Sequence, residues 1–330
     1  MDSYDGVEKL RLGELPDPEP AHDQVLLRMT FAALNPADAF LAKKMYPANP
    51  QLPHVLGRDG VGDVLAVGSE VRDVQVGDTV GLLRCDAGVE SWGTLAELTV
   101  VPAASVARIP QGWSAEQMAA APLVFLTAWQ ALTMWSDPPA PPREGSVLLV
   151  TGASGGVGVA SVLLGTSLKL TVVGLSRSTG KAARLKELGA HAVFDPAATD
   201  LRRSVSAAIA PRKVDLAIDN VGSELFNQVI AMLGYGGRVS VVGRSGGPVP
   251  SFNTATLLFR RNRIGGVAVG DYTPESAHAA WTEIVSRLQA IGARPVVDSI
   301  FAFSDVKAAF ARLAEGPMGK VVVRVGKEYQ

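Results

Sequence analysis

The amino-acid sequence predicts an α/β protein in which a doubly wound parallel sheet is combined with a second, β-rich unit. Between residues 147 and 242, short apolar runs alternate with helical segments, which is typical of a parallel sheet with helices on both faces. Between residues 25 and 106, short β-rich runs are separated by glycine and proline. The chain has 330 residues and is 47% hydrophobic, which is enough for about two domains with a core each.

Composition and charge exclude several function classes. The formal net charge is −1, so no overall electrostatic field favours nucleic acid or an acidic membrane surface. No apolar run approaches the ~20 residues of a membrane-spanning helix, and the acidic start is not typical of a signal peptide. The single cysteine, Cys85, excludes an intramolecular disulfide and agrees with a reducing compartment. We expect a cytoplasmic protein with no nucleic-acid partner and no membrane insertion.

The β-rich unit is expected to be barrel-like and to contain short strands at Val25 to Met29, Gly60 to Val67, Thr79 to Leu83 and Leu95 to Val100. A helical segment from Ala115 to Met134 follows it. Ser114 has the features of the helix N-cap, with Gln117 three residues later as its capping-box partner. Pro122 is expected to break the segment into two helices.

After the proline-rich linker at residues 137–142, strands and helices alternate. We expect strands at 147–151, 170–175, 193–194, 214–218 and 237–242, and helices at 157–168, 180–188, 200–209 and 225–233. The C-terminal part of the sequence predicts a helix at Pro274 to Ile291 and a strand at Val296 to Phe301. A helix at Phe303 to Leu313, capped by Ser304, and a last strand at Lys320 to Val325 are expected to follow.

The strongest chemical signal is the glycine-rich turn between the strand at 147–151 and the helix that follows it. Without a Cβ, glycine lets the backbone approach a pyrophosphate, and the helix start aims free N–H groups at the negative charge. The candidate cofactor contacts in this turn are Gly152, Ser154, Gly155, Gly156 and Val157. A plain tight connection between strand and helix is the alternative interpretation.

The end of the next parallel strand indicates which dinucleotide is bound. An NAD site would usually place Asp or Glu about twenty residues past the glycines, where it binds the ribose hydroxyls and repels a 2′-phosphate. Here Ser176 is neutral, Arg177 can form a forked contact to phosphate, and Lys181 adds a positive charge. NADPH is therefore favoured over NADH. A solvated loop that opens the next helix is the alternative.

Two later strands are expected to end at the same cofactor. In open parallel sheets, ligands bind at the carboxyl ends of the strands. Asn220 and Val221 follow one strand, and Gly243 and Arg244 follow another. These four residues are therefore predicted to face the cofactor.

Motifs along nearly the whole chain match one family. They are residues 57–62, Val67-Gly68, residues 76–80, the turn at 152–158, and the ending Met318 to Val322. With the β-rich first half, they resemble the medium-chain dehydrogenase/reductase family. The resemblance implies a Rossmann doubly wound sheet, at residues 119–269, inserted in a GroES-like, partly open barrel that forms the catalytic domain at residues 1–118 and 270–330. It also implies a homodimer in which Ile264 to Val269 pairs with its mate.

Within that family, the chain resembles the zinc-independent, NADPH-dependent quinone oxidoreductase branch. Asn35-Pro36-Ala37-Asp38 stands where the zinc enzymes carry a metal-binding cysteine, and Gly57-Arg58-Asp59 replaces their Gly-His-Glu. A zinc alcohol dehydrogenase is thus nearly excluded, since arginine is no useful zinc ligand and one cysteine cannot form the structural zinc lobe. His54 lies close by but lacks partner ligands.

The chain departs from the family pattern in two places. It lacks an obvious first strand at residues 2–6. Pro196 stands where the family has a tyrosine that can stack near the adenosine.

The implied reaction is hydride transfer from NADPH to a quinone or a conjugated enone, acceptors that need no metal to polarise them. The resemblance also implies that Asn35 lies near the nicotinamide and substrate, Tyr46 at the substrate mouth, and Thr127 near the nicotinamide carboxamide. Each has an alternative: an Asx-type turn for Asn35, a surface-packed loop aromatic for Tyr46, and a helix cap for Thr127.

Two alternative functions stay open. The first is an enoyl thioester reductase, for which Arg244 and the cluster Arg260, Arg261 and Arg263 are the candidate cations for the carrier. The same cluster is also interpreted as a solvated turn beside a strand. The second is an NADPH-binding protein with a sensing or structural role and no turnover.

Overall fold

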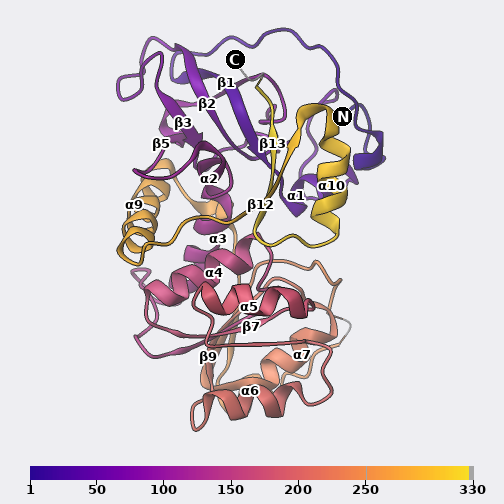
Figure 1. Cartoon of the computed structure of the whole chain (residues 1–330), viewed down its shortest axis with the longest axis vertical. Coiled ribbons are helices and arrows are strands. Elements are labelled where there is room, and N and C mark those ends of the chain that lie inside the picture. The colour runs from indigo at the N-terminus through magenta and orange to yellow at the C-terminus, as the bar shows by residue number, and fades with distance from the viewer. Residues whose placement is uncertain (250, 327–330) are drawn as a thin grey trace. The chain divides into compact units, whose positions relative to one another are not determined.

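The computed structural model describes residues 1–249 and 251–326 (Figure 1). The chain forms two compact units. Unit 1 comprises Met1–Leu123, Gly270–Thr282 and Arg294–Gln330, and unit 2 comprises Val124–Val269 and Glu283–Ala293. Each unit has its own sheet, and the two sheets differ in strand direction. The predicted α/β class, with a β-rich unit and a parallel-sheet unit, is confirmed.

The sheet of unit 1 is mostly antiparallel and has the order β12-β13-β1-β2-β3-β5, with β4 also paired to β1. Its strands are β1 (Gln24–Ala33), β2 (Asp59–Val67), β3 (Thr79–Leu82), β4 (Leu98–Pro102), β5 (Val106–Arg108), β12 (Val297–Ala302) and β13 (Lys320–Arg324). The late strand β13 lies between β12 and β1, and Val323 is opposite Ala32. The first and last described parts of the chain therefore build one sheet.

Helices and short 3₁₀ turns surround this sheet: η1 (Val7–Lys9), α1 (Pro36–Ala42), η2 (Ala103–Ser105), α2 (Ala115–Ala119), η4 (Phe303–Asp305) and α10 (Val306–Ala314). In Figure 1, α10 lies beside the yellow strands, and it packs against β12 and β13. Phe310 of α10 joins a buried core that includes Leu27 of β1 and Val321 of β13. Burial of such side chains is the main force that holds the helix on the sheet.

Most of the helix starts predicted from capping residues and prolines are confirmed. Ser114 caps α2, because its hydroxyl oxygen accepts a hydrogen bond from the Gln117 N–H. In return, the Ser114 N–H donates to the side-chain oxygen of Gln117. A new helix, α3 (Pro122–Thr133), begins at the predicted break. The predicted cap at Ser304 is wrong, because residues 303–305 form a 3₁₀ turn and α10 follows Asp305. Within the described residues, nothing before Gln24 is a strand, as the sequence indicated.

The sheet of unit 2 is built from parallel pairings in the order β11-β10-β9-β6-β7-β8. Its strands are β6 (Val147–Val150), β7 (Thr171–Leu175), β8 (Ala192–Phe194), β9 (Val214–Asp219), β10 (Leu233–Val241) and β11 (Arg263–Gly266). The chain runs outward from β6 to β8 and then returns to build β9 to β11 on the other side. The order thus reverses between β6 and β9, and such a reversal is where open parallel sheets bind ligands.

The remaining helices are α4 (Gly156–Ser167), α5 (Thr179–Glu187), α6 (Leu201–Ile209), α7 (Ser223–Met232), α8 (Ala255–Arg260) and α9 (Pro274–Ala290), with a 3₁₀ turn η3 (Val269–Asp271). Residues 274–282 of α9 belong to unit 1 and the rest of it to unit 2. The two compact units divide between Leu123 and Val124, and α2, which packs on β1, β2 and β3, lies in unit 1.

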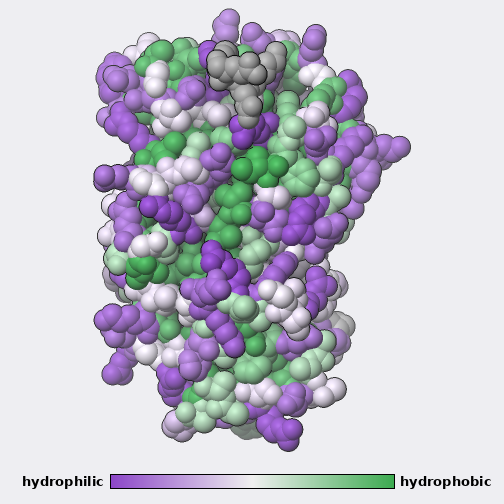
Figure 2. Space-filling view, viewed as in Figure 1, coloured by the Kyte–Doolittle hydropathy of each residue, from purple (hydrophilic) through white to green (hydrophobic). Residues whose placement is uncertain are grey.

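The surface is mixed in character. Figure 2 shows hydrophobic areas interspersed among hydrophilic ones on one face of the molecule. In the parts of the chain that the structure describes, no helix has the length and apolar character needed to cross a membrane.

Candidate active site

The glycine-rich turn of unit 2 connects the buried strand β6 to α4. Gly152 has a φ of +58°, which favours glycine. A Cβ on Gly158 would lie 2.3 Å from the carbonyl oxygen of Gly152 and 2.6 Å from the carbonyl carbon of Ala153, so only glycine fits there. Gly155 is the N-cap of α4 and, in the described structure, no side chain caps that helix. The first N–H groups of α4, those of Gly156 and Val157 among them, are therefore available to an anion.

Side chains at the carboxyl ends of β6 and β9 connect these two strands at the reversal point. Asp219, at the end of β9, is completely buried and accepts a 2.7 Å hydrogen bond from the Thr151 hydroxyl. It also accepts hydrogen bonds from the backbone N–H groups of Val221 (3.2 Å) and Gly222 (3.1 Å). The Asn220 side-chain amide donates to the Thr151 carbonyl at 2.8 Å. Asn220 and Val221 are thus held in fixed positions beside the turn.

Thr151 and Asp219 were not among the site residues predicted from the sequence. A signal for Asp219 was present, because it is an acidic residue that directly follows the apolar run Leu216 to Ile218 and needs buried partners.

The loop after β10 lies directly against the loop after β9. The Gly246 N–H donates to the Val221 carbonyl at 2.8 Å, and the Ser245 hydroxyl donates to the Asn220 carbonyl at 3.0 Å. The structure therefore brings Gly243 and the exposed Arg244 next to Asn220 and Val221, at the carboxyl ends of neighbouring strands.

The residues predicted to select the dinucleotide follow β7. Ser176 is buried and its hydroxyl accepts a hydrogen bond from the Ser178 N–H at 3.4 Å. Arg177 is exposed and, among residues 1–249 and 251–326, its side chain has no hydrogen-bond or ion-pair partner. Lys181 lies in the first turn of α5. No carboxylate occurs between Ser176 and Lys181, so this corner of the unit is neutral to positive.

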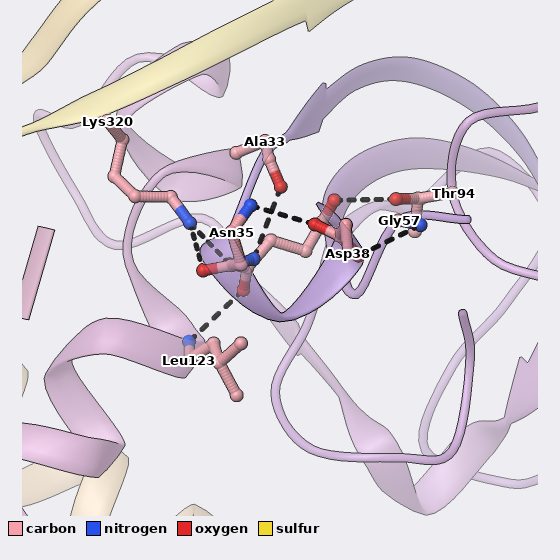
Figure 3. Close-up of polar contacts among 8 residues, drawn as sticks. Ala33, Asn35, Asp38, Gly57, Thr94, Leu123 and Lys320 are labelled. Carbon is pink, nitrogen blue, oxygen red and sulfur yellow. Dashed lines mark hydrogen bonds and ion pairs between the residues drawn. The ribbon is translucent and has the colours of Figure 1, made fainter. Parts of the chain in front are cut away.

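In unit 1, Asn35 belongs to a buried polar cluster at the start of β2 (Figure 3). The Lys320 ammonium group lies 2.9 Å from Oδ2 of Asp59 and 2.5 Å from Oδ1 of Asn35. The Asn35 amide donates to the same Asp59 oxygen at 2.9 Å, and the Leu123 N–H, at the start of α3, donates to the other at 3.1 Å. The side chain of Asp59 is completely buried and that of Lys320 is 5% exposed. The amide of Asn35 is therefore held at both ends by charged partners.

Asp38 is a second buried carboxyl group beside this cluster. It accepts hydrogen bonds from the N–H groups of Asn35 (2.7 Å) and Gly57 (3.3 Å), and so joins the start of α1 to the residues before β2. Burial raises the pKa of Asp38 to about 6, although the Asn35 N–H and the charges of Arg58 and Lys320 act in the opposite direction.

Tyr46 is paired with Arg58. The guanidinium donates to the Tyr46 hydroxyl at 3.0 Å and lies 5.4 Å from the centre of its ring. Both residues are half-buried. Thr127, the third predicted catalytic residue, lies in α3 within unit 2 and is 9% exposed.

The positions that would hold zinc in related enzymes contain a different set of groups. Asn35 and Asp59 contact each other and Lys320, and Arg58 contacts Tyr46. Across the residues that the structure describes, no three His, Cys, Asp or Glu side chains are grouped so that they could hold a metal ion.

Comparison with known proteins agrees with this two-unit architecture. Residues 21–111 match the alcohol dehydrogenase GroES-like domain, and residues 156–290 match the zinc-binding dehydrogenase family. A crystal structure of an NAD-dependent alcohol dehydrogenase is 30% identical, with 97% of each chain covered and a TM-score of 0.88. The chain belongs to the medium-chain dehydrogenase/reductase family. Its resemblance to that family is thereby confirmed.

Other proteins similar to this chain have different named activities or bound cofactors. A quinone oxidoreductase of Pseudomonas aeruginosa is 28% identical over 315 residues, which cover 94% of each chain. An acryloyl-coenzyme A reductase of Sulfurisphaera tokodaii is 28% identical over 254 residues, 71% of this chain and 73% of that one. A mycobacterial protein complexed with NADPH is 26% identical with a TM-score of 0.85, over 97% of this chain and 96% of that one.

Proposed function

We propose that the protein is an NADPH-dependent oxidoreductase that transfers hydride to a quinone or a conjugated enone without a metal ion. The observation that carries the proposal is the uncapped start of α4 beside a glycine turn, followed at the end of β7 by Ser176 and Arg177 instead of a carboxylate. Likeness to a quinone oxidoreductase and to a protein complexed with NADPH supports it.

The residues of unit 2 fit a phosphorylated dinucleotide. In the described structure no side chain caps α4, so its first backbone N–H groups are open for the pyrophosphate. Arg177 has a forked guanidinium for a 2′-phosphate, and the neighbouring Ser176 does not repel it. Lys181 adds positive charge at the same corner. Asn220, Val221, Gly243 and Arg244 are proposed to line the rest of the dinucleotide site.

In unit 1, we assign the substrate end to Asn35 and Tyr46, with Thr127 of unit 2 near the nicotinamide. NADPH, when bound, supplies the hydride. Reduction of a quinone or enone also needs a proton for the oxygen that gains charge, and the Tyr46 hydroxyl, which accepts from Arg58 in this structure, is the proposed donor. Lys320 and Asp59 fix the Asn35 amide, so that it does not rotate when substrate binds.

The test is oxidation of NADPH and of NADH, followed by absorbance, with a quinone, a short enone and an enoyl thioester as acceptors. We expect turnover that prefers NADPH, with the quinone or enone as the best acceptor. No turnover with any acceptor, combined with a higher melting temperature in NADPH, would instead support a binding protein without catalysis.

A second candidate function is reduction of an enoyl thioester, favoured by the likeness to an acryloyl-coenzyme A reductase. The exposed Arg244 and the exposed cluster Arg260, Arg261 and Arg263 are the candidate contacts for the carrier. Faster turnover of the enoyl thioester than of the quinone in the same assay would establish this alternative.

We also propose that the protein is a cytoplasmic homodimer that pairs through β11. This strand is at an edge of the unit 2 sheet, and Leu258 (73% exposed), Phe259 (77%) and Ile264 (36%) leave apolar surface near it. Light scattering should give twice the monomer mass, and Ile264→Lys should convert the protein to a monomer. A monomeric unmodified protein would exclude this part of the proposal.

A further inference from the structure

A cavity of about 940 Å³ lies in unit 2. The glycine turn is at the carboxyl ends of the parallel strands, and this cavity is at the opposite, amino ends. It is partly open and is lined by residues 199–200, one face of α6, the C-terminal part of α7, the residues that precede β9 and open β10, and Arg260. The candidate dinucleotide contacts all lie at the carboxyl ends of strands, whereas this cavity lies at the amino ends of β9 and β10. Its size is in the range of pockets that hold small molecules.

The cavity wall carries an excess of positive charge. Arg202, Arg203, Lys213 and Arg260 line it, and Asp200 is its only carboxylate among the residues that the structure assigns to the wall. Asp200 is already engaged, because it accepts from the Ser204 hydroxyl at 2.9 Å and lies 4.0 Å from Arg203. The whole chain has a net charge of −1, so this excess is local to the cavity.

The four cations are not equivalent. Arg260, the last residue of α8, donates to the carbonyl groups of Ala231 and Leu233, 3.1 Å each, so its guanidinium is held against the C-terminal end of α7. Within the described ranges, 1–249 and 251–326, the side chains of Arg202 and Lys213 have no hydrogen-bond or ion-pair partner. The cavity is therefore lined by two cations without a partner among the described residues, Arg202 and Lys213, and by a third, Arg260, that is held in place.

An aromatic side chain is held at the same cavity by an irregular strand. Leu233 is opposite Val214 and Arg238 is opposite Leu216, so β10 contains three more residues than β9 over this interval. The extra residues include Tyr235, which is 74% exposed and lines the cavity. The Asn262 amide donates to the carbonyl of Gly234 at 2.7 Å and stabilises the bulge. Bulges of this kind commonly redirect a side chain toward a functional site.

We propose that this cavity binds a nucleotide, with its phosphates on Arg202, Lys213 and Arg260 and its base stacked on Tyr235. Guanidinium groups form forked contacts with phosphate oxygens, and an exposed aromatic ring is a stacking surface for a planar base. Because the cavity is at the amino ends of the strands and the glycine turn at their carboxyl ends, its occupant would not compete with a bound dinucleotide. The inference does not depend on the proposed reaction.

Calorimetric titration with ADP and with inorganic pyrophosphate tests the proposal. ADP can also enter a dinucleotide site, so the variants must separate the two. Arg202→Gln combined with Lys213→Gln should weaken ADP binding at least tenfold and leave the affinity for NADPH at the glycine turn unchanged. The matched control is Arg143→Gln with Lys186→Gln, which removes two exposed cations elsewhere in unit 2 and should have no effect.

Tyr235→Ala distinguishes a nucleotide from a simple anion. Loss of base stacking should weaken ADP about tenfold and leave pyrophosphate within about twofold. Equal weakening of both ligands, or unchanged ADP binding in the Arg202 and Lys213 variant, would overturn the proposal. Much tighter binding of a single-stranded oligonucleotide than of ADP would also overturn it, in favour of a nucleic-acid surface. All these side chains are exposed, so unchanged melting temperatures should confirm that the variants fold.

Discussion

The Lys320 ammonium group and the Asp59 carboxylate form a buried ion pair, 2.9 Å apart, that joins the first residue of β13 to the first residue of β2 (Figure 3). The same Asp59 oxygen and Lys320 hold the Asn35 amide between them. Water is excluded from all three side chains, so each charge depends on the other for its solvation. The pair thus stabilises unit 1 and orients a residue that we assign to the substrate end.

Removing Lys320 alone should be strongly destabilising. We expect Lys320→Met to lower the free energy of unfolding by about 3–5 kcal/mol, because it leaves the Asp59 charge buried without a partner. Chemical denaturation followed by circular dichroism measures the loss. The double variant Lys320→Met with Asp59→Asn should recover part of it. As a control, Lys169→Met, which removes the exposed pair with Glu144, should cost less than about 1 kcal/mol. A loss below about 1 kcal/mol for Lys320→Met would show that the Asp59 charge does not depend on Lys320.

Asp38 should make the protein less stable as the pH rises from about 4 to 7. Its pKa is raised from 3.8 to about 6 by burial, so in this window the folded state holds a proton that the unfolded chain has lost. The contribution to the free energy of unfolding falls by on the order of 3 kcal/mol across the window. Denaturation of the unmodified protein and of Asp38→Asn at several pH values gives the free energy of unfolding of each, and the difference between the two curves isolates the contribution of Asp38. Parallel stability curves for the two proteins would show that Asp38 does not titrate in this way.

Two glycines of the turn should respond differently to alanine. A Cβ on Gly158 meets backbone at 2.3 Å, so Gly158→Ala must displace the turn and should lower both the melting temperature and NADPH affinity. A Cβ on Gly155 comes no closer than 3.5 Å to its nearest neighbour, so Gly155→Ala should keep the melting temperature of the unmodified protein. Differential scanning calorimetry and fluorescence titration with NADPH provide the two readouts. Equal melting temperatures for the two variants would contradict the packing argument.

Arg177 should determine the preference for NADPH. Arg177→Ala removes a charge-assisted contact worth about 1.5–3 kcal/mol, so KM for NADPH should rise roughly 10- to 100-fold while KM for NADH stays constant. Arg184→Ala on α5, which removes only the exposed pair with Glu187, is the matched control. Equal changes for the two cofactors in Arg177→Ala would place the 2′-phosphate elsewhere.

Features encoded by neighbouring residues could be predicted from the sequence. The capping box of Ser114 and Gln117 and the helix break at Pro122 depend on residues a few positions apart. The turn at 152–158 is likewise contiguous, and so are the apolar runs of the parallel strands. Ser304 was misassigned as a cap because a 3₁₀ turn and a helix start carry similar short-range signals.

Features that depend on strand register could not be predicted in this way. Asp59 meets Lys320 only because β13 and β2 both pair with β1, and nothing local to either residue indicates the partner. A lysine at the start of an apolar strand does signal that a buried counter-charge exists, although not which one. The contact of Thr151 with Asp219 similarly depends on the adjacency of β6 and β9. The cavity beside Tyr235 depends on an irregularity in β10 that has no sequence signature beyond its glycines.

The position of β13 inside its sheet, between β12 and β1, imposes an order on events during synthesis. Strands β1 to β5 leave the ribosome early, but the edge of β1 that β13 covers stays without its partner until the whole of unit 2 has been made. Most of unit 2 is one continuous stretch, residues 124–269, and it can complete its sheet first. A nascent chain arrested before Lys320 should therefore contain a protease-resistant second unit and an unfinished first one that exposes a strand edge to chaperones.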